Sequence, residues 1–243
     1  MKVPGTILQV DDLRIAINGY IAVDGISFSV KEGEILGIVG ESGCGKSLTA
    51  LSIPLLLPET ARITGGTIRY RGAGQTKDGQ AAMDLSRLPE SALREIRGKE
   101  ISMVFQEPHS SLNPLLRIGR QITEPLELHG EKDKAETRQK ALSLMDGLGL
   151  PEPEKLLSLY PHQLSGGMCQ RVMIAMAMIC GPRLLIADEP TTALDVNTQT
   201  QILELLKQIN RETGTAILFI SHDLSVIRSI CHRVLVMYAG KLV

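Results

Sequence analysis

The chain has 243 residues, and its 43% hydrophobic content is enough to bury the core of one compact domain, so a disordered chain is excluded. Its 26 basic and 27 acidic side chains leave a net charge of −1, which gives no long-range field to collect DNA or RNA, so no nucleic-acid partner is expected. The four cysteines contain no C-x-x-C pair and the longest apolar run is about half the length that a bilayer requires, so we expect a reducing compartment and no membrane span.

The first predicted elements are short strands separated by turn residues. Residues 7–17, 25–30 and 34–40 have the apolar and β-branched content of strands, with an Asn-Gly turn after the first. Tyr20 is expected to lie between the first two strands, exposed by this turn. Its ring is predicted to stack on a purine base, and the alternative is a plain packing tyrosine.

The stretch that follows the third strand fills every fixed position of the phosphate-binding pattern G-x-x-x-x-G-K-[ST]. Its members, all expected to bind a nucleotide, are Gly40, Glu41, Ser42, Gly43, Cys44, Gly45, Lys46 and Ser47. The glycines let backbone N–H groups turn toward a phosphate, Lys46 would reach the β- and γ-phosphates, and Ser47 would give its hydroxyl to Mg²⁺. A helix is predicted to start near Lys46 and to kink or end at Pro54. Taken alone, this loop also fits a small-molecule kinase or a GTPase.

A second group of elements separates this loop from the later motifs. In chain order they are an edge strand at 64–70, a loop at 71–80, a buried strand at 101–105 that ends at Gln106, an ordered loop at 107–119 and helices at 118–150. Helices inserted into an α/β core at this point predict a second, smaller subdomain.

One turn and the ends of two further strands carry the other candidate site residues. They are Ser165, Gly166 and Gly167 in a turn that opens a helix, Asp188 and Glu189 after the strand 183–187, and His222 after the strand 216–220. The free N–H groups at the start of the helix can hold a phosphate. Adjacent carboxylates after a buried strand are costly unless they serve a metal or a reaction, so Asp188 is assigned to Mg²⁺ and Glu189 to the orientation of a water molecule. Four predicted strands thus end at Gly40, Gln106, Asp188 and His222. Ligands bind at the carboxyl ends of the strands in open parallel sheets.

In combination, these motifs resemble those of an ABC-transporter nucleotide-binding subunit. The motifs are the phosphate loop, Gln106, LSGGM at Leu164, LLIADEP at Leu184, Ala193-Leu194-Asp195 and Ser221-His222, and they span nearly the whole chain. The phrases FQEPHSSLNP and DEPTTALDVNTQTQIL are similar to the ATPases of the oligopeptide, dipeptide and nickel importers of prokaryotes. The resemblance implies an α/β fold with a P-loop NTPase core, a mostly parallel sheet, an antiparallel β N-terminal layer and an α-helical insertion. It implies a single domain over 1–243, with a core subdomain at about 1–106 and 181–243 and a helical subdomain at about 107–180.

The resemblance also implies a role for each site residue. Within one chain, Lys46 would bind the phosphates, Ser47, Gln106 and Asp188 would bind Mg²⁺, Glu189 would act on the attacking water, and His222 would contact the γ-phosphate. In a head-to-tail dimer, Ser165, Gly166 and Gly167 would act on the ATP bound by the other copy. Asp195 would belong to the loop that crosses between the subunits. Met168 stands where many relatives have Gln, which puts a side-chain hydrogen bond there in doubt, although importer ATPases often have Met. Relatives usually continue past the closing strand, which here ends at Val243.

The function implied by the resemblance is ATP hydrolysis that drives import of peptides or nickel through separate integral membrane permease subunits. The chain would lie at the cytoplasmic face of the membrane, paired with itself or with a similar ATPase, and would serve a substrate-binding protein indirectly. Its docking surface is expected in the loop after Gln106 and the helices up to about Leu150. One alternative is a soluble ABC ATPase that remodels ribosomes or DNA, but such proteins carry two cores or a long coiled coil, which this sequence lacks. The other is a regulatory protein that binds ATP without turnover, and the intact Glu189 argues against it.

Cys44 carries a separate hypothesis, because it stands in the phosphate loop beside Lys46. An ammonium and a helix N-terminus both favour a thiolate, which predicts a thiol that reagents attack and that MgATP protects. The alternative is a small residue tolerated at a variable position of the loop. The cysteines at 169, 180 and 231 are expected to be small apolar fillers.

Overall fold

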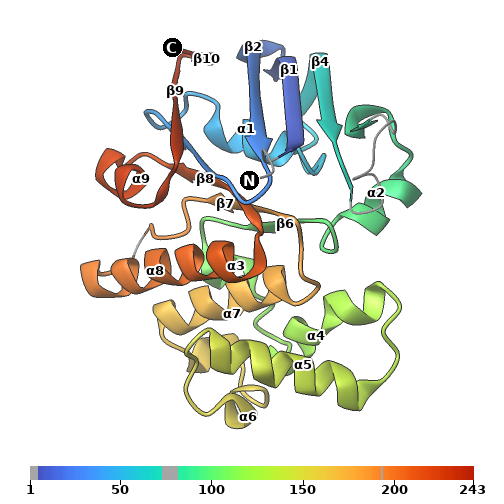
Figure 1. The fold of residues 1–243 in the computed structure, drawn as a ribbon, viewed down its shortest axis with the longest axis vertical. Helices are drawn as coiled ribbons and strands as arrows, with labels where there is room; N and C mark the ends of the chain where they lie inside the picture. Colours follow the sequence, from blue (N-terminus) through green and yellow to red (C-terminus); the bar gives the residue numbers. More distant parts are fainter. Residues whose placement is uncertain (1–4, 73–81, 193) are drawn as a thin grey trace.

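The computed structural model describes residues 5–72, 82–192 and 194–243, and its strands form two sheets (Figure 1). Within these residues the first sheet is antiparallel and has the order β2-β1-β4-β5. Its strands are β1 (Thr6–Ile17), β2 (Tyr20–Lys31), β4 (Ala61–Tyr70) and β5 (Met83–Asp84). The second sheet is mostly parallel, has the order β10-β9-β3-β8-β7-β6, and has these members: β3 (Ile35–Val39), β6 (Ile101–Val104), β7 (Leu184–Asp188), β8 (Ala216–Ser221), β9 (Arg233–Tyr238) and β10 (Lys241–Leu242). The predicted fold class is therefore confirmed.

The antiparallel layer starts with a tight hairpin. Ile17 pairs with Tyr20, and the two turn residues between them, Asn18 and Gly19, have φ angles of 49° and 86°. Such positive φ angles let two strands join directly through two residues. Tyr20 is therefore the first residue of β2, so the prediction that it lies between two short strands is wrong. Each of these strands has 12 residues.

The central strands of the parallel sheet are apolar because both faces of the sheet are covered. All residues of β3, β7 and β8 are buried. Along β8, Ile217 and Phe219 pack into a core shared with the helices, whereas Leu218 and Ile220 pack into a core shared with the antiparallel layer. Burying one such side chain contributes about 1.5–3 kcal/mol, so this sheet holds the two layers together.

Helix α1 (Lys46–Ser52) begins within the phosphate loop, at Lys46, and ends before Pro54, as predicted. Proline lacks the N–H that a continuing helix would need, which is why the apolar run after the helix is not helical. The prediction that β4 is an edge strand holds for only part of it, because its last two residues, Arg69 and Tyr70, pair with β5. Residues 73–80 of the predicted loop lie outside the described residues.

Several helices follow β6 in sequence and precede β7, as the predicted insertion requires. They are α3 (Pro108–Ser111), α4 (Ile118–Leu128), α5 (Lys134–Gly147), α6 (Pro153–Leu156) and α7 (Gly166–Met178). Besides α1, the α-helices elsewhere in the described residues are α2 (Glu90–Ile96), α8 (Val196–Thr213) and α9 (Leu224–Ile230). The prediction of a loop at 107–119 is partly wrong, because Pro108 occupies the first turn of α3, where proline is favourable, and the buried Ile118 begins α4. Figure 1 shows α4, α5 and α6 at the opposite end of the molecule from the antiparallel layer.

Helix α7 connects this insertion to the sheet. Its buried residues share one hydrophobic cluster with α4, α5 and the β7 and β8 side chains that face the helices. Across the described ranges, no helix combines the length and the apolar composition needed to cross a membrane.

Candidate functional site

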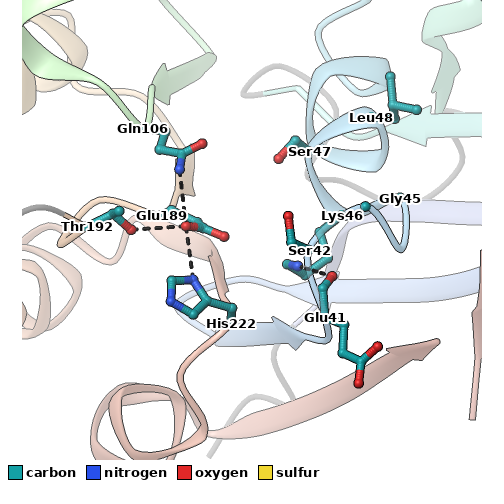
Figure 2. A pocket seen from close by; sticks show the side chains of 11 residues that line it. Glu41, Ser42, Gly45, Lys46, Ser47, Leu48, Gln106, Glu189, Thr192 and His222 are labelled. Atoms are coloured by element: carbon teal, nitrogen blue, oxygen red, sulfur yellow. Dashed lines mark hydrogen bonds and ion pairs between the residues drawn. The ribbon is translucent and has the colours of Figure 1, made fainter. Parts of the chain in front are cut away.

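A pocket of about 610 Å³ lies at the carboxyl ends of the parallel strands (Figure 2). Its lining residues are Glu41, Ser42, Gly43, Gly45, Lys46, Ser47, Leu48, Gln106, Glu189, Thr192 and His222. Parallel pairing places the ends of β3, β6, β7 and β8 at the same edge of the sheet, which brings these distant segments together. Figure 2 shows the phosphate loop on one side and Gln106, Glu189, Thr192 and His222 on the other.

Glycines of the phosphate loop are required by both conformation and close packing. Gly43 and Gly45 have φ angles of 78° and 106°, in the left-handed region that side chains avoid. A Cβ added at Gly40 would lie 2.1 Å from the carbonyl oxygen of Met237, and one at Gly45 would lie 2.8 Å from that of Ala22. Gly43 has open space around it, so its side of the loop can approach a ligand.

The start of α1 offers backbone donors to this pocket. Gly45 is the N-cap of the helix, and no side chain of the described residues caps its first turn. Lys46 is buried, and its Nζ donates to the carbonyl oxygens of Gly40 and Glu41 at 2.8 Å each. These contacts fix an ammonium group within the loop, where loop amides and a positive charge together suit a phosphate.

Ser47, at the end of the phosphate loop, and Asp188 place two oxygen atoms side by side as possible metal ligands. The Ser47 hydroxyl donates to Asp188 Oδ1 at 3.2 Å. Burial raises the pKa of Asp188, and the hydrogen bond from Ser47 partly offsets this effect. Mg²⁺ prefers hard oxygen ligands and usually binds one or two protein groups together with substrate phosphates. The two side chains fit such an ion, whose positive charge would favour the ionised form of the buried carboxylate.

Three hydrogen bonds converge on one oxygen of Glu189. Its Oε2 lies 3.3 Å from Gln106 Nε2, 3.0 Å from Thr192 Oγ1 and 3.0 Å from His222 Nδ1. A carboxylate only accepts hydrogen bonds, so Nδ1 carries a proton in this contact. Glu189 itself has a φ of 48°, a conformation that costs energy in a residue with a side chain and that occurs often at functional sites.

The structure adds two lining residues to those that the sequence indicated, Leu48 and Thr192. Thr192 lines the pocket and contacts Glu189, but its sequence position predicts only a loop residue after the strand. A hydroxyl three residues after a candidate catalytic carboxylate is a signal that could have identified it.

Several predicted site residues do not line this pocket. They are Tyr20, Gly40, Cys44, Ser165, Gly166, Gly167, Asp188 and Asp195. Asp188 reaches its edge through Ser47, and Tyr20 is 79% exposed on the hairpin. Ser165 Oγ accepts from the backbone N of Met168 at 3.3 Å and so caps α7 as the predicted turn requires.

The first turn of α8 packs on this same turn. Asp195 caps α8, and its Oδ2 accepts from Thr198 Oγ1 at 2.6 Å. A Cβ added at Gly167 would lie 2.7 Å from the methyl group of Thr198. Ala193, the first residue of the Ala-Leu-Asp motif, lies outside the described residues.

Cys44, Cys169 and Cys231 pack as apolar fillers in the hydrophobic clusters. Cys44 is 6% exposed and belongs to the hydrophobic cluster beneath the antiparallel layer, so its side chain does not enter the pocket. Burial raises the pKa of the Cys231 thiol to about 12 and also raises that of Cys169. These two thiols are therefore poor nucleophiles.

Comparisons with known proteins agree on one family. Residues 23–192 match the family model described as ABC transporter. The chain is 51% identical, over 98% of its length and 69% of the relative, to a probable peptide ABC transporter ATP-binding protein of Sinorhizobium fredii. It is 48% identical, over 97% of its length and 68% of the relative, to an oligopeptide transport ATP-binding protein of Escherichia coli. A solved dimeric structure of an ATP-binding cassette in a post-hydrolysis state with ADP and Pi has 30% identity and a TM-score of 0.81, with 97% of this chain and 96% of that chain covered.

Proposed function

This chain belongs to the ABC transporter family of ATPases, and from that premise we propose that it powers peptide import through separate membrane subunits. The observation that carries the proposal is an identity of 45% to 51%, over nearly the whole chain, with ATP-binding proteins named for peptide, oligopeptide or dipeptide transport. Peptides are therefore the proposed cargo, ahead of the nickel that the sequence motifs also allow.

The pocket supports a division of labour in ATP hydrolysis. Lys46 and the loop amides would hold the phosphates, and Tyr20 would stack on the adenine. Ser47, Gln106 and Asp188 would hold Mg²⁺, which when bound neutralises charge on the triphosphate. Glu189 would orient the attacking water, because its Oε1 accepts no hydrogen bond from the described residues. His222 would contact the γ-phosphate from the end of β8.

We further propose that two such chains, or this chain and a similar ATPase, form a head-to-tail dimer. The solved cassette with a TM-score of 0.81 is described as dimeric, which supports this arrangement. Ser165, Gly166 and Gly167 would then act on the ATP held by the other chain, and Asp195 would lie in the crossing loop. Their absence from the pocket of their own chain is consistent with that role.

A second, mostly apolar cavity supports a docking surface for membrane subunits. Its volume is about 210 Å³, and its lining includes Leu56, Phe105, Ser111, Pro125 and Met176. It lies between the edge strand β6 and the helices α3, α4 and α7, and its lining residues come from both sides of Gln106 in sequence. We therefore propose residues 107–180 as the helical subdomain that docks, and residues 1–106 and 181–243 as the core.

Docking of this kind would place the chain at the cytoplasmic face of the membrane, as a peripheral subunit. The test is copurification of the full chain with its membrane partners, followed by reconstitution in lipid vesicles with a substrate-binding protein. ATP-dependent uptake of labelled peptides is expected, and a Glu189→Gln variant in the same complex serves as the control.

Three outcomes separate the possibilities. Peptide uptake that requires ATP and intact Glu189 supports the proposal. Uptake of Ni²⁺ alone would replace the cargo but keep the transport function. Copurification with ribosomes or DNA, and no membrane protein, would favour the soluble ABC ATPase.

A further inference from the structure

All three hydrogen bonds to the Glu189 carboxylate use the same oxygen, and the donors differ in how firmly they are held. Gln106 is exposed, and the side chain of His222 is 57% exposed. Both come from other strands and are proposed to move onto Mg²⁺ or the γ-phosphate. Thr192 is half-buried and comes from the same loop as Glu189.

Two contacts couple Thr192 to Glu189 independently of the other strands. The backbone N of Thr192 donates to the carbonyl oxygen of Glu189 at 3.2 Å, and its Oγ1 donates to Oε2 at 3.0 Å. The backbone N of Glu189 is itself held by the carbonyl oxygen of Ile220 at 2.9 Å. Thr192 therefore stays beside the carboxylate when Gln106 and His222 turn toward a ligand.

We propose that Thr192 is a positioning residue, whose hydroxyl holds Glu189 Oε2 so that Oε1 faces the attacking water. The inference rests on the proposed role of Glu189. A carboxylate can rotate about its last bond, and because its two oxygens are equivalent, the freedom that matters is the tilt of the carboxylate plane, which sets where the second oxygen points. A charge-assisted hydrogen bond from a fixed hydroxyl removes this freedom before the reaction begins.

The test compares two substitutions at this position in the purified full chain. Thr192→Val keeps the β-branched shape and removes the donor, whereas Thr192→Ser keeps the donor. Thr192→Val should lower kcat about 10- to 100-fold, the range for loss of a group that orients a functional side chain, while the KM for ATP changes by less than about twofold. Thr192→Ser should recover most of the rate.

A matched control is Thr200→Val, which removes a hydroxyl that donates at 2.9 Å to the carbonyl oxygen of Val196 within its own helix α8. None of the described residues lining the pocket comes from α8, so kcat should stay within about twofold of wild type. Thermal unfolding of all variants shows whether the fold is kept.

A double variant separates this inference from the proposed function. In a Glu189→Gln background, Thr192→Val should cause no further loss, because the hydroxyl acts through the carboxylate. A further loss of equal size would overturn the positioning role, and so would a wild-type rate for Thr192→Val or a failure of Thr192→Ser to recover activity. If Glu189→Gln itself turns over at the wild-type rate, the proposed role of Glu189 fails and the inference fails with it.

Discussion

The two turns proposed to hold phosphate differ in how complete their surroundings are. The loop Gly40–Ser47 faces Gln106, Glu189 and His222 across a pocket of about 610 Å³. The turn at Ser165 contributes nothing to that pocket, and its hydroxyl is used to cap its own helix at Met168. One turn thus has its reactive partners within the same chain, and the other does not.

This difference follows from the element that carries each turn. A parallel sheet collects the ends of several strands at one edge, so distant segments of one chain can build a pocket there. The turn at Ser165 opens a single helix and lies beside Leu194 and Thr198 of its own chain, so its backbone donors do not face the polar side chains of the pocket. A turn of this kind needs a second surface to complete a site, which supports the proposed head-to-tail dimer.

The largest effect is expected when the pocket beside the phosphate loop loses the carboxylate of Glu189. Glu189→Gln should lower turnover by about 100-fold or more, the scale of a general base, because the amide cannot take a proton from water. Lys46, Ser47 and Asp188 remain, so ATP binding should persist and hold the dimer closed. Phosphate release and binding of a fluorescent ATP analogue measure the two properties separately.

The outcome that would contradict this prediction is hydrolysis by Glu189→Gln at close to the wild-type rate. His222, which lies 3.0 Å from Glu189, would then be the better candidate for the base.

The turn at Ser165 can be blocked by a substitution that leaves the fold intact. Among the described residues, a Cβ at Gly166 would meet only Leu194 Cδ2, at 3.9 Å, and a carboxylate in the first turn of α7 is favourable to the helix. Gly166→Asp should therefore fold normally but repel the γ-phosphate of the other chain. Hydrolysis should fall about 10- to 100-fold while each chain still binds ATP.

Gly166→Ala is the matched control, since it adds bulk without charge and should lose much less activity. Size-exclusion chromatography in the Glu189→Gln background should show an ATP-bound dimer for the Ala variant and monomers for the Asp variant. A stable ATP-bound dimer of the Asp variant with wild-type hydrolysis would mean that this turn does not act across the interface.

The phosphate loop and the hydrogen bonds around Glu189 also differ in how far the sequence predicts them. The phosphate loop, the start of α1 and Asp188 at the end of β7 follow from local patterns, since each is set by residues within one strand, turn or helix. The bonds that make Glu189 the centre of a network depend on the order of strands in the sheet. Gln106 and Glu189 are 83 residues apart, and no local pattern predicts that Gln106, Thr192 and His222 contact the same oxygen of Glu189.

Errors in the predicted elements have local physical causes. The sequence indicates the Asn-Gly turn, but the left-handed backbone of Asn18 and Gly19 joins the strands through these two residues alone, so Tyr20 belongs to β2. Proline content at 107–119 indicated a loop, although Pro108 suits the first turn of α3. Thr192 lies after a strand and has no periodic pattern, so its contact with Glu189 appears only in three dimensions.

A smaller effect on ATPase activity is expected from the proposed docking surface. Glu107 is exposed, and the hydroxyls of Ser110 and Ser111 bond to its backbone carbonyl oxygen, so Glu107→Lys should leave α3 intact. Transport by the reconstituted complex should be lost, whereas the ATPase activity of the isolated chain should stay within about twofold of wild type.

The control for this reversal is Glu204→Lys on α8, where an exposed ion pair with Lys207 at 2.7 Å contributes little. It should affect neither activity. Equal loss of transport and ATPase activity in Glu107→Lys would count against a separate docking role and would connect Glu107 to the pocket itself.

The smallest effect is expected at Cys44, where the sequence allowed either a reactive thiol or a small filler. Its 6% exposure and its place in the core favour the filler, although Lys46 Nζ lies 3.9 Å from Sγ. Cys44→Ser should keep ATPase activity within about twofold of wild type. A thiol reagent can reach Cys44 only when the loop opens locally, so inactivation should be slow and MgATP should slow it further by holding the loop closed. Undiminished inactivation of Cys44→Ser by the same reagent would assign the effect to Cys169, Cys180 or Cys231, and would remove the argument for a redox-sensitive phosphate loop.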